Sequence, residues 1–382
     1  MHNYSNLSDL ADACEKFHDH FQDQRTIETL TTRRKLADWI RKFHHECGTL
    51  TSQVEQALEK LSSNNCLLLM TAHQPNLFAY GGVLRKATLN HVLAKTLSER
   101  LDVPVVSFFG LADQDFTDDR WVRSALLPDS ERRNGVLELR VVLPEKIMLN
   151  RTPKPAHVVL DKWQHDVDDW IHRKTKAVTA LGKAMGVQLD HIPTSEYSEN
   201  LKQFWSIVTE AYDRAQSYAD FNAFVISRVI NDTCGYDTLF CRFSECQKIF
   251  KREFELLTRE FKKYSQALQD AIPTSRPEER GVYNDECHTV PVWYHCDCGS
   301  KARLAATKIE LNITGRGKCL RCGKEYEIDF SQDSEVWTNL DRVTARALTM
   351  PLVFFNGLGV TCYVGGVGGR QYLRQEIGRA HV

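Results

Sequence analysis

Residues Leu67–Phe78, with the sequence LLLMTAHQPNLF, decide the fold of this chain. The apolar run Leu67–Met70 is short and bounded by polar residues, which is typical of a buried parallel strand. Two glycines, Gly81 and Gly82, then lead into Val83–Leu97, where apolar residues recur at helical spacing. A strand, a polar loop and a helix form half of a βαβ unit, so this stretch predicts a parallel α/β core.

Polar side chains follow this first strand directly. His73, Gln74 and Asn76 occupy the loop, and ligands of open α/β sheets bind beyond the carboxyl ends of the strands. The loop therefore predicts a catalytic or binding site. A histidine that only caps the next helix fits the same pattern, and that alternative stays open.

A second strand is predicted at Val103–Phe109, which is rich in β-branched and aromatic residues. It ends in a loop that contains Asp113, Gln114 and Asp115. Carboxylates at this position suit a substrate amine, a divalent cation or a general base. The alternative is a solvated acidic turn. We favour the functional interpretation, because two successive strands end in polar loops.

The composition limits the class of protein. The 382 residues leave room for two or three domains, and a formal net charge of −1 gives no electrostatic signature of wholesale nucleic-acid binding. No apolar run approaches the ~20 residues that span a bilayer, and the N-terminus lacks the pattern of a signal peptide. We therefore expect a cytoplasmic protein. In that compartment twelve cysteines indicate metal ligands or free thiols before disulfides.

The strongest local signal lies at Cys296-Asp297-Cys298-Gly299 and Cys319-Leu320-Arg321-Cys322-Gly323. Two cysteine knuckles, each followed by glycine and joined by a strand-like spacer, predict a ribbon that holds one structural Zn²⁺. The first knuckle is C-x-C, so His295 is an alternative to Cys296 as the ligand. We choose Cys296, and four thiolates would leave no open position for catalysis.

A third core strand is predicted at Leu358–Val364, followed by the glycine-rich loop Gly365–Gly369. Such a loop can present backbone N–H groups to an anion, although a plain flexible turn has the same composition. The spacing is not that of a dinucleotide fingerprint. The last seven residues, Glu376–Val382, resemble a translated sequencing adapter, so we expect the natural chain to continue beyond Gln375.

Single residues and short segments elsewhere in the chain support further expectations. The histidines at positions 18, 20, 44 and 45 are expected on solvated helix faces, and Cys234, Cys241 and Cys246 as buried thiols. Within the predicted helical insert, Phe224–Ile230 and Leu239–Arg242 are candidate strands. Together these patterns divide the chain into six parts. They are a helical region at 1–65, the first part of the core at 66–150, a helical connecting insert at 151–285, a zinc ribbon at 286–335, the second part of the core at 336–375, and the adapter-like end at 376–382.

Three segments in this order resemble the cysteine-adding enzyme family of bacillithiol biosynthesis. They are the stretch from Thr71 to Phe116, Thr344–Leu352 (TARALTMPL), and Thr361–Gly369 (TCYVGGVGG). The family has a G-H-Q or G-Q-Q loop, an acidic D-H-D-like loop and a Y-V-G-G-P-G loop. Here these correspond to Ala72–Gln74, Asp113–Asp115 and Tyr363–Gly368. Gln114, Val367 and Gly369 stand where the family has histidine, proline and glutamate; the ribbon is an addition, and the family's C-terminal helical extension is missing.

The resemblance implies a Rossmann-like core related to class I synthetases and nucleotidyltransferases. It also implies a ligase that adds cysteine, or a similar amino acid, to the amine of a sugar conjugate such as glucosaminyl-malate. In this interpretation His73 and Gln74 orient or deprotonate the substrate, and Asp115, helped by Asp113, holds an ammonium group. The remaining substrate-binding residues would be Asn76, Gln114, Tyr363, Gly365, Gly366 and Gly368.

Two other functions stay open at this stage. One is nucleotidyl transfer on the same fold, and the other is a zinc-ribbon binding module without catalysis. ATP is a candidate co-substrate, and a homo-oligomer is a candidate assembly of the full-length protein. Basic residues surround the ribbon, but the absence of interleaved aromatic residues argues against nucleic acid as its partner.

Overall fold

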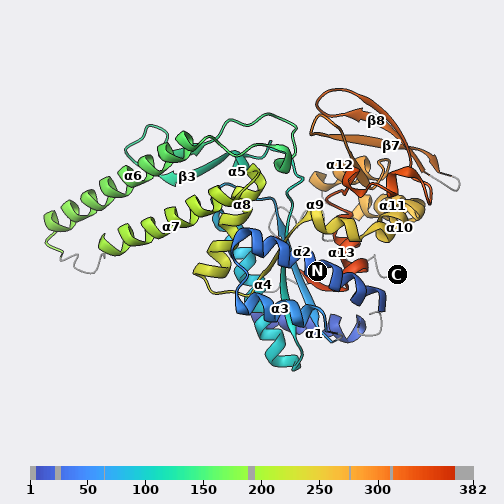
Figure 1. Ribbon diagram of the computed structural model, residues 1–382, viewed down its shortest axis with the longest axis horizontal. Coiled ribbons are helices and arrows are strands. Elements are labelled where there is room, and N and C mark those ends of the chain that lie inside the picture. The colour runs from blue at the N-terminus through green and yellow to red at the C-terminus, as the bar shows by residue number, and fades with distance from the viewer. Residues whose placement is uncertain are drawn as a thin grey trace.

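The centre of the computed structural model is a four-stranded parallel sheet in the order β11-β1-β2-β5 (Figure 1). The structure describes residues 6–21, 27–63, 65–187, 194–274, 277–309 and 313–365. All three strand pairings are parallel, which confirms the predicted Rossmann-like core. The strands are β1 (Leu67–His73), β2 (Val105–Leu111), β5 (Leu239–Arg242) and β11 (Val360–Tyr363).

Helices cover both faces of this sheet, which explains why β1 is apolar without alternation. Leu67 and Leu69 of β1 pack with side chains of α1 (Leu7–Phe21) and α4 (Gly81–Leu101). Leu68 and Met70 point to the opposite face and pack with α2 (Ile27–Cys47) and α3 (Ser52–Leu61). Successive side chains of a strand alternate between faces, so this one run contributes to two hydrophobic clusters.

Part of the predicted helical insert belongs to the core sheet. The candidate strand Leu239–Arg242 is β5, and it pairs with β2. The other candidate strand, Phe224–Ile230, is wrong, because these residues lie in helix α8 (Tyr218–Ser227) and in the π-helix Arg228–Thr233 that continues it. The segment is buried on nearly all sides, and an apolar run of this length reads equally well as a strand.

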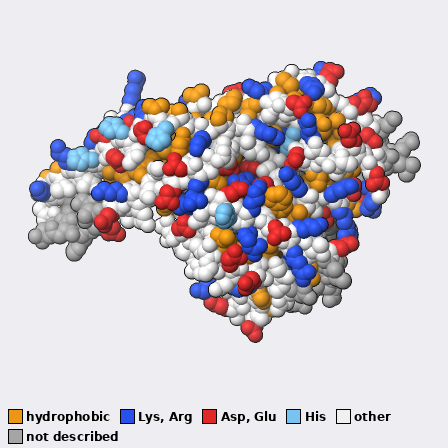
Figure 2. Space-filling view, in the orientation of Figure 1, with side chains coloured by type: hydrophobic (Ala, Val, Ile, Leu, Met, Phe, Trp, Pro, Cys, Tyr) orange, Lys and Arg blue, Asp and Glu red, His pale blue; other side chains and the backbone are white. Residues whose placement is uncertain are grey.

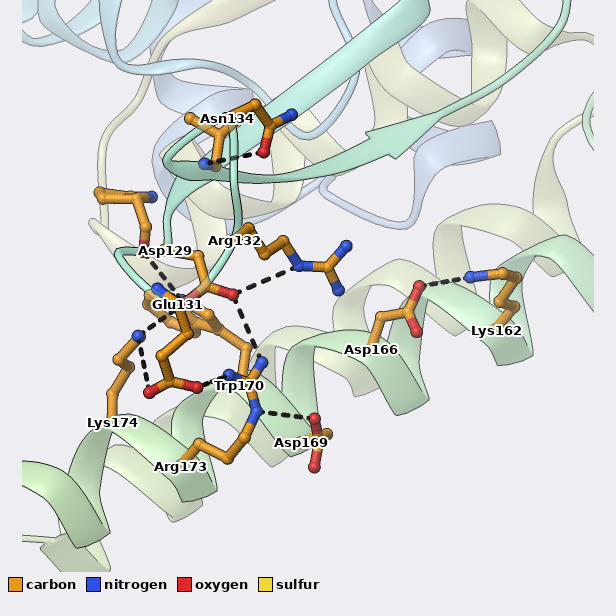
Figure 3. A network of polar contacts seen from close by, with 12 residues as sticks. Asp129, Glu131, Arg132, Asn134, Lys162, Asp166, Asp169, Trp170, Arg173 and Lys174 are labelled. Carbon is orange, nitrogen blue, oxygen red and sulfur yellow. Dashed lines mark hydrogen bonds and ion pairs between the residues drawn. The ribbon is translucent and has the colours of Figure 1, made fainter.

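Two long helices, α6 (His157–Ala184) and α7 (Thr194–Arg214), extend from the core as an arm (Figure 1). The hairpin of β3 (Ser124–Pro128) and β4 (Val136–Arg140) lies along this arm. Its turn is fixed to α6 by a polar network (Figure 3).

In that network the buried carboxylate of Asp129 contacts Lys174 Nζ at 2.7 Å and Arg173 Nη2 at 3.4 Å. The lysine lowers the pKa of Asp129 to about 2, so the carboxylate is ionised at neutral pH. The weakly alternating segment at 135–146 thus forms one strand of a hairpin that is anchored by charge as well as by packing.

The ribbon is a separate antiparallel sheet in the order β10-β6-β7-β8-β9. Its β10 lies within the range 336–375, which the sequence assigned to the core, but it pairs with β6 instead of with a core strand. Gly317 of β8 packs so tightly that an added Cβ would lie 1.9 Å from the Arg303 carbonyl oxygen. The strands are β6 (Val292–His295), β7 (Lys301–Ile309), β8 (Ile313–Cys319), β9 (Glu325–Asp329) and β10 (Val343–Ala345).

Shorter helices connect these units. The α-helices are α5 (Arg120–Arg123), α9 (Phe243–Cys246), α10 (Lys251–Arg259), α11 (Phe261–Ala271), α12 (Pro277–Glu286) and α13 (Met350–Leu358). The 3₁₀ turns are Leu149–Arg151, Gln247–Ile249, Ile272–Thr274, Glu335–Trp337 and Leu340–Arg342. In the part of the chain that the structure describes, no helix is long and apolar enough to cross a membrane.

Two expectations for single residues are wrong, and several others fall outside the described residues. His44 is fully buried, although we expected it on a solvated face, whereas its neighbour His45 is exposed. Cys234 is exposed, while Cys241 and Cys246 are buried as expected. The side chains of residues 18 and 20, the loop residues Gly366 and Gly368, and the segment 376–382 lie outside the described residues.

Candidate functional site

The loops predicted to carry function follow three neighbouring strands of one sheet. Because β1, β2 and β11 are parallel, their carboxyl ends lie at the same edge. The chain runs from β1 to β2 to β5 and then returns to β11 on the other side of β1. The end of β11 is tied to β1, since Thr71 Oγ1 donates to the Val364 carbonyl and Val364 N donates to the Met70 carbonyl, each at 2.7 Å. This reversal of strand order creates a switch point between β1 and β11, where α/β sheets bind ligands.

The loop after β1 has an unusual backbone. Phe78 and Ala79 have positive φ angles of 55° and 50°, a conformation that is uncommon for residues other than glycine. The ring of Phe78 is held between those of Trp163 and Trp205 at centroid distances of 5.5 and 5.9 Å. Aromatic packing therefore stabilises a strained loop, and such strain clusters at functional sites.

His73 is a neutral imidazole with a defined tautomer. Its Nδ1 lies 2.9 Å from the Gln74 carbonyl oxygen, which only accepts hydrogen bonds. Burial, together with the nearby charge of Lys86, lowers the pKa of His73 to about 4. The hydrogen of neutral His73 is thus on Nδ1, and Nε2 carries the lone pair.

Lys86 and Asn76 complete the surroundings of His73. Lys86, on the second turn of α4, donates from Nζ to the Ala72 carbonyl at 3.2 Å, and burial lowers its pKa to about 8. Asn76 is fully buried, and neither atom of its side-chain amide has a hydrogen bond of regular geometry among the described residues, although the amide lies close enough to His73 to act on its pKa. A buried amide without regular hydrogen bonds is costly, so Asn76 has the capacity to bind a polar group of a ligand.

Asp113 and Gln114 make contacts inside the protein. Asp113 is buried and accepts hydrogen bonds from Ser244 N at 3.0 Å and from the Ser244 hydroxyl, and its burial raises its pKa to about 6. Gln114 is also buried, and its Oε1 accepts a 2.7 Å hydrogen bond from Thr344 Oγ1 of β10. Both side chains therefore position neighbouring segments, and their predicted role as substrate-binding residues stays a prediction.

Asp115 is the carboxylate of this loop that remains accessible. Its side chain is about half exposed, and its Oδ1 lies 4.0 Å from Nζ of Lys301 on β7. The surrounding protein raises the pKa of Asp115, while Lys301 acts in the opposite direction. The negative charge of Asp119 acts to raise the pKa of both His73 and Asp115. These two side chains therefore share one charged region at the edge of the sheet.

The four predicted cysteines form a compact cluster. The sulfur atoms of Cys296, Cys298, Cys319 and Cys322 all lie within 4.8 Å of one another. The pairs Cys296–Cys322 and Cys298–Cys319 are each separated by 3.5 Å, near the ~3.8 Å edge of a tetrahedron with Zn–S bonds of about 2.3 Å. The geometry and the donor set both fit a closed Zn²⁺ site.

His295 is not a member of this cluster. Its Nδ1 contacts the Asp341 carbonyl oxygen at 2.7 Å, and its Nε2 contacts the Thr344 hydroxyl. The glycines that follow the knuckles, Gly299 and Gly323, have φ angles of +83° and +72°, a conformation that glycine adopts without strain. This geometry favours Cys296 over His295 as the fourth ligand.

Several site residues escaped the sequence analysis. Lys86 could have been found from its position near the start of the helix that follows the first loop. Tyr80, which stacks on Trp121 at 5.2 Å and lies 5.9 Å from the His73 ring, and Lys301 gave no comparable signal. Of the predicted glycine loop the structure describes only Gly365, which is exposed, and Tyr363 contributes backbone pairing with Met70.

A cavity of about 330 Å³ lies elsewhere, between α10 and the ribbon. Arg252, Glu255 and Arg259 of α10 line it together with Phe330 and Gln332. None of its lining residues belongs to the strand-end loops, so this cavity is distinct from the region around His73 and Asp115.

Comparison with known proteins identifies the first part of the chain. Residues 3–124 match the family model described as "Bacillithiol biosynthesis BshC, N-terminal Rossmann-like domain". The matched segment contains β1, β2 and the loops with His73 and Asp115. The arm, the ribbon and β11 lie outside it.

Proposed function

We propose that this chain, which through its Rossmann-like domain belongs to the bacillithiol biosynthesis BshC family, is a carbon–nitrogen ligase that adds cysteine to the amine of a sugar conjugate such as glucosaminyl-malate. The observation that carries the proposal is the family match over the segment that holds His73 and Asp115. His73 ends β1 and Asp115 follows the adjacent parallel strand β2, so they lie at the same edge of the sheet.

Amide formation sets two chemical requirements. The attacking amine must lose a proton, and the carboxyl carbon of cysteine must carry a leaving group, which ATP as co-substrate would supply and which departs as phosphate or as a nucleotide. Neutral His73, with its lone pair on Nε2, accepts the proton of the amine as the C–N bond forms. The carboxylate of Asp119 acts to raise the pKa of His73, which favours the imidazolium that results. Lys86 supplies positive charge, or a neutral amine, beside the same imidazole.

The other polar groups bind substrate. Asp115 presents an accessible carboxylate to an ammonium group, and Asn76 offers a buried amide at the end of β1. Gly365 begins the loop that we assign to an anionic group, at the switch point beside β1. Gln74 orients His73 through its backbone carbonyl.

We assign the cysteine cluster to one structural zinc ion. Four thiolates would fill the tetrahedral coordination of Zn²⁺ and leave no position for a substrate or a reactive water. The ion would stabilise the knuckles that connect β6 to β7 and β8 to β9. Its contribution to the reaction is therefore to fold the ribbon.

The proposal is tested by incubating the protein with glucosaminyl-malate and cysteine in the presence and absence of ATP. Mass spectrometry should detect the cysteinyl amide. Pyrophosphate or phosphate release that depends on cysteine would identify ATP as the source of activation. Nucleotide transfer to glucosaminyl-malate without amide formation would favour the nucleotidyltransferase alternative and reject the ligase.

A further inference from the structure

Lys301 is a buried lysine at the junction between the ribbon and the core. Its side chain is 3% exposed, and it lies on β7 immediately after the first cysteine knuckle. Its Nζ lies 4.9 Å from the ring centroid of Phe116 and 5.5 Å from that of Trp293. The two aromatic faces hold the ammonium in place, but they do not replace the hydrogen bonds that water would make to its three N–H groups.

The nearest carboxylate pairs with Lys301 only at a distance. Asp115 Oδ1 is 4.0 Å from Lys301 Nζ, which is beyond hydrogen-bond distance. Burial lowers the pKa of Lys301, and the charge of Asp115 acts in the opposite direction. A buried charge of this kind is costly unless a partner is supplied. Asp115 is 52% exposed, so a partner can approach the pair from solvent.

A second cation on the same wall has an unused donor. The guanidinium of Arg346 lies 4.1 Å from the ring centroid of Trp293, and its Nε donates to Glu286 at 2.6 Å. Its Nη1 is enclosed and has no hydrogen-bond partner in the described part of the chain. Two cations thus lie on the ribbon side, and the loop after β2 presents the accessible carboxylate of Asp115.

We propose that Lys301 and Asp115 together bind the α-carboxylate and the α-ammonium of an amino acid, so that the ribbon supplies half of the amino-acid site. The inference rests on the proposed function only in placing the amino acid at the Asp115 edge. In an α-amino acid the nitrogen and a carboxylate oxygen lie about 3 Å apart, as covalent bond lengths require. Placed beside the 4.0 Å pair, these two groups complete a ring of four alternating charges.

Direct binding tests this inference without the acceptor substrate or ATP. L-cysteine and L-serine share the α-carboxylate and the α-ammonium, cysteamine lacks the carboxylate, and 3-mercaptopropionate lacks the ammonium. Isothermal titration of the zinc-loaded full chain should show binding of both amino acids. Each of the two incomplete analogues should bind at least tenfold more weakly.

Variants then test whether Lys301 binds the carboxylate of the amino acid. Lys301→Met keeps the length of the side chain without its charge, and it should weaken L-cysteine binding at least tenfold while leaving cysteamine unchanged. Lys318→Met is the matched control, because Lys318 is an exposed lysine of β8 whose Nζ pairs with Glu325 at 2.8 Å. It should leave L-cysteine binding unchanged. Zinc content and near-UV circular dichroism establish that each variant is folded.

Three results would overturn the inference: no amino-acid binding by the wild-type chain, equal binding of cysteine and cysteamine, or wild-type affinity in folded Lys301→Met. If Lys301→Met fails to fold, the binding of the four analogues to the wild-type chain still tests whether the site recognises both the carboxylate and the ammonium group. Amino-acid binding without amide product would reject the ligase and keep this site. Amide product with unaltered binding in Lys301→Met would reject this site and keep the ligase.

Discussion

Thr344 of the ribbon and Gln114 of the core are joined by a 2.7 Å hydrogen bond between Oγ1 and Oε1. The Thr344 hydroxyl also contacts His295, which immediately precedes Cys296 of the cysteine cluster. A chain of buried contacts therefore runs from the metal cluster to the loop after β2. The position of this loop depends on the fold of the ribbon, although the two units use separate sheets.

Loss of a cysteine ligand should remove the metal and unfold the ribbon. Cys322→Ser is expected to abolish zinc binding, because metal binding and local folding are coupled. Elemental analysis measures the metal, and hydrogen exchange of residues 290–309 and 313–330 measures the fold. Cys234→Ser is the control, since Cys234 is an exposed thiol outside the cluster. Freshly purified wild-type protein without zinc, prepared in the absence of chelators, would reject the assignment of the cluster.

The choice of Cys296 over His295 has its own test. Cys296→Ala should lose the metal, whereas His295→Ala should retain it, because both ring nitrogens of His295 are engaged with Asp341 and Thr344. The measurement is again the zinc content of the purified variants. Retention by Cys296→Ala together with loss by His295→Ala would reverse the ligand assignment and leave the ribbon itself intact.

His73→Ala should lower turnover more than substrate affinity. Proton transfer acts mainly in the transition state, and a general base contributes roughly 10²-fold or more. Steady-state kinetics of amide formation should therefore show a fall in kcat of that order with a small change in KM. His45→Ala, at an exposed position on α2, should behave as wild type. A change in KM alone would make His73 a binding residue and exclude it as the base.

His44 should make stability depend on pH. Its Nε2 accepts from Phe240 N, its Nδ1 contacts Thr49 Oγ1, and burial lowers its pKa to about 3. The unfolded chain takes up a proton near pH 6.5, and the folded chain does not do so until about pH 3. Stability is therefore complete above about pH 6.5 and declines as the pH falls toward 3. His73 and His295, with pKa values lowered to about 4 and 3, act in the same direction.

The contribution of His44 can be isolated by substitution. His44→Gln should reduce the slope of unfolding free energy against pH by about 1.4 kcal/mol per unit between pH 4 and 6, the value for one proton. Urea unfolding followed by tryptophan fluorescence gives this slope. His45→Gln should leave it unchanged, because that imidazole is exposed. An unaltered slope in His44→Gln would show that His44 is protonated in the folded chain.

The parallel core was predictable because its signal is local. Leu67–Met70 is apolar at consecutive positions since both faces of β1 are covered. The cysteine cluster was predictable for a similar reason, because ligand spacing along the chain fixes its chemistry. In both cases the information lies in short stretches of sequence: one apolar run, and two knuckles with two cysteines each.

The rest depends on contacts between distant segments. Lys301 meets Asp115 only because the ribbon packs against the loop after β2, and no pattern around Lys301 indicates this. β10 is three residues long and pairs with a ribbon strand that lies far from it in sequence. His44 was misassigned because it stands among charged residues, yet Ile40 and Cys47, one helical turn away on either side, are buried. That spacing was the signal that we missed.

The product of the reaction tests the central claim most directly. Full-length, zinc-loaded protein should convert glucosaminyl-malate and L-[1-¹³C]cysteine into a product with the combined mass of both substrates less one water. The labelled carbon should lie in an amide, and the product should still react with iodoacetamide at a free thiol. Folded protein that yields no such product with or without ATP, or that attaches cysteine through its sulfur, would contradict the assignment as a cysteine-adding ligase.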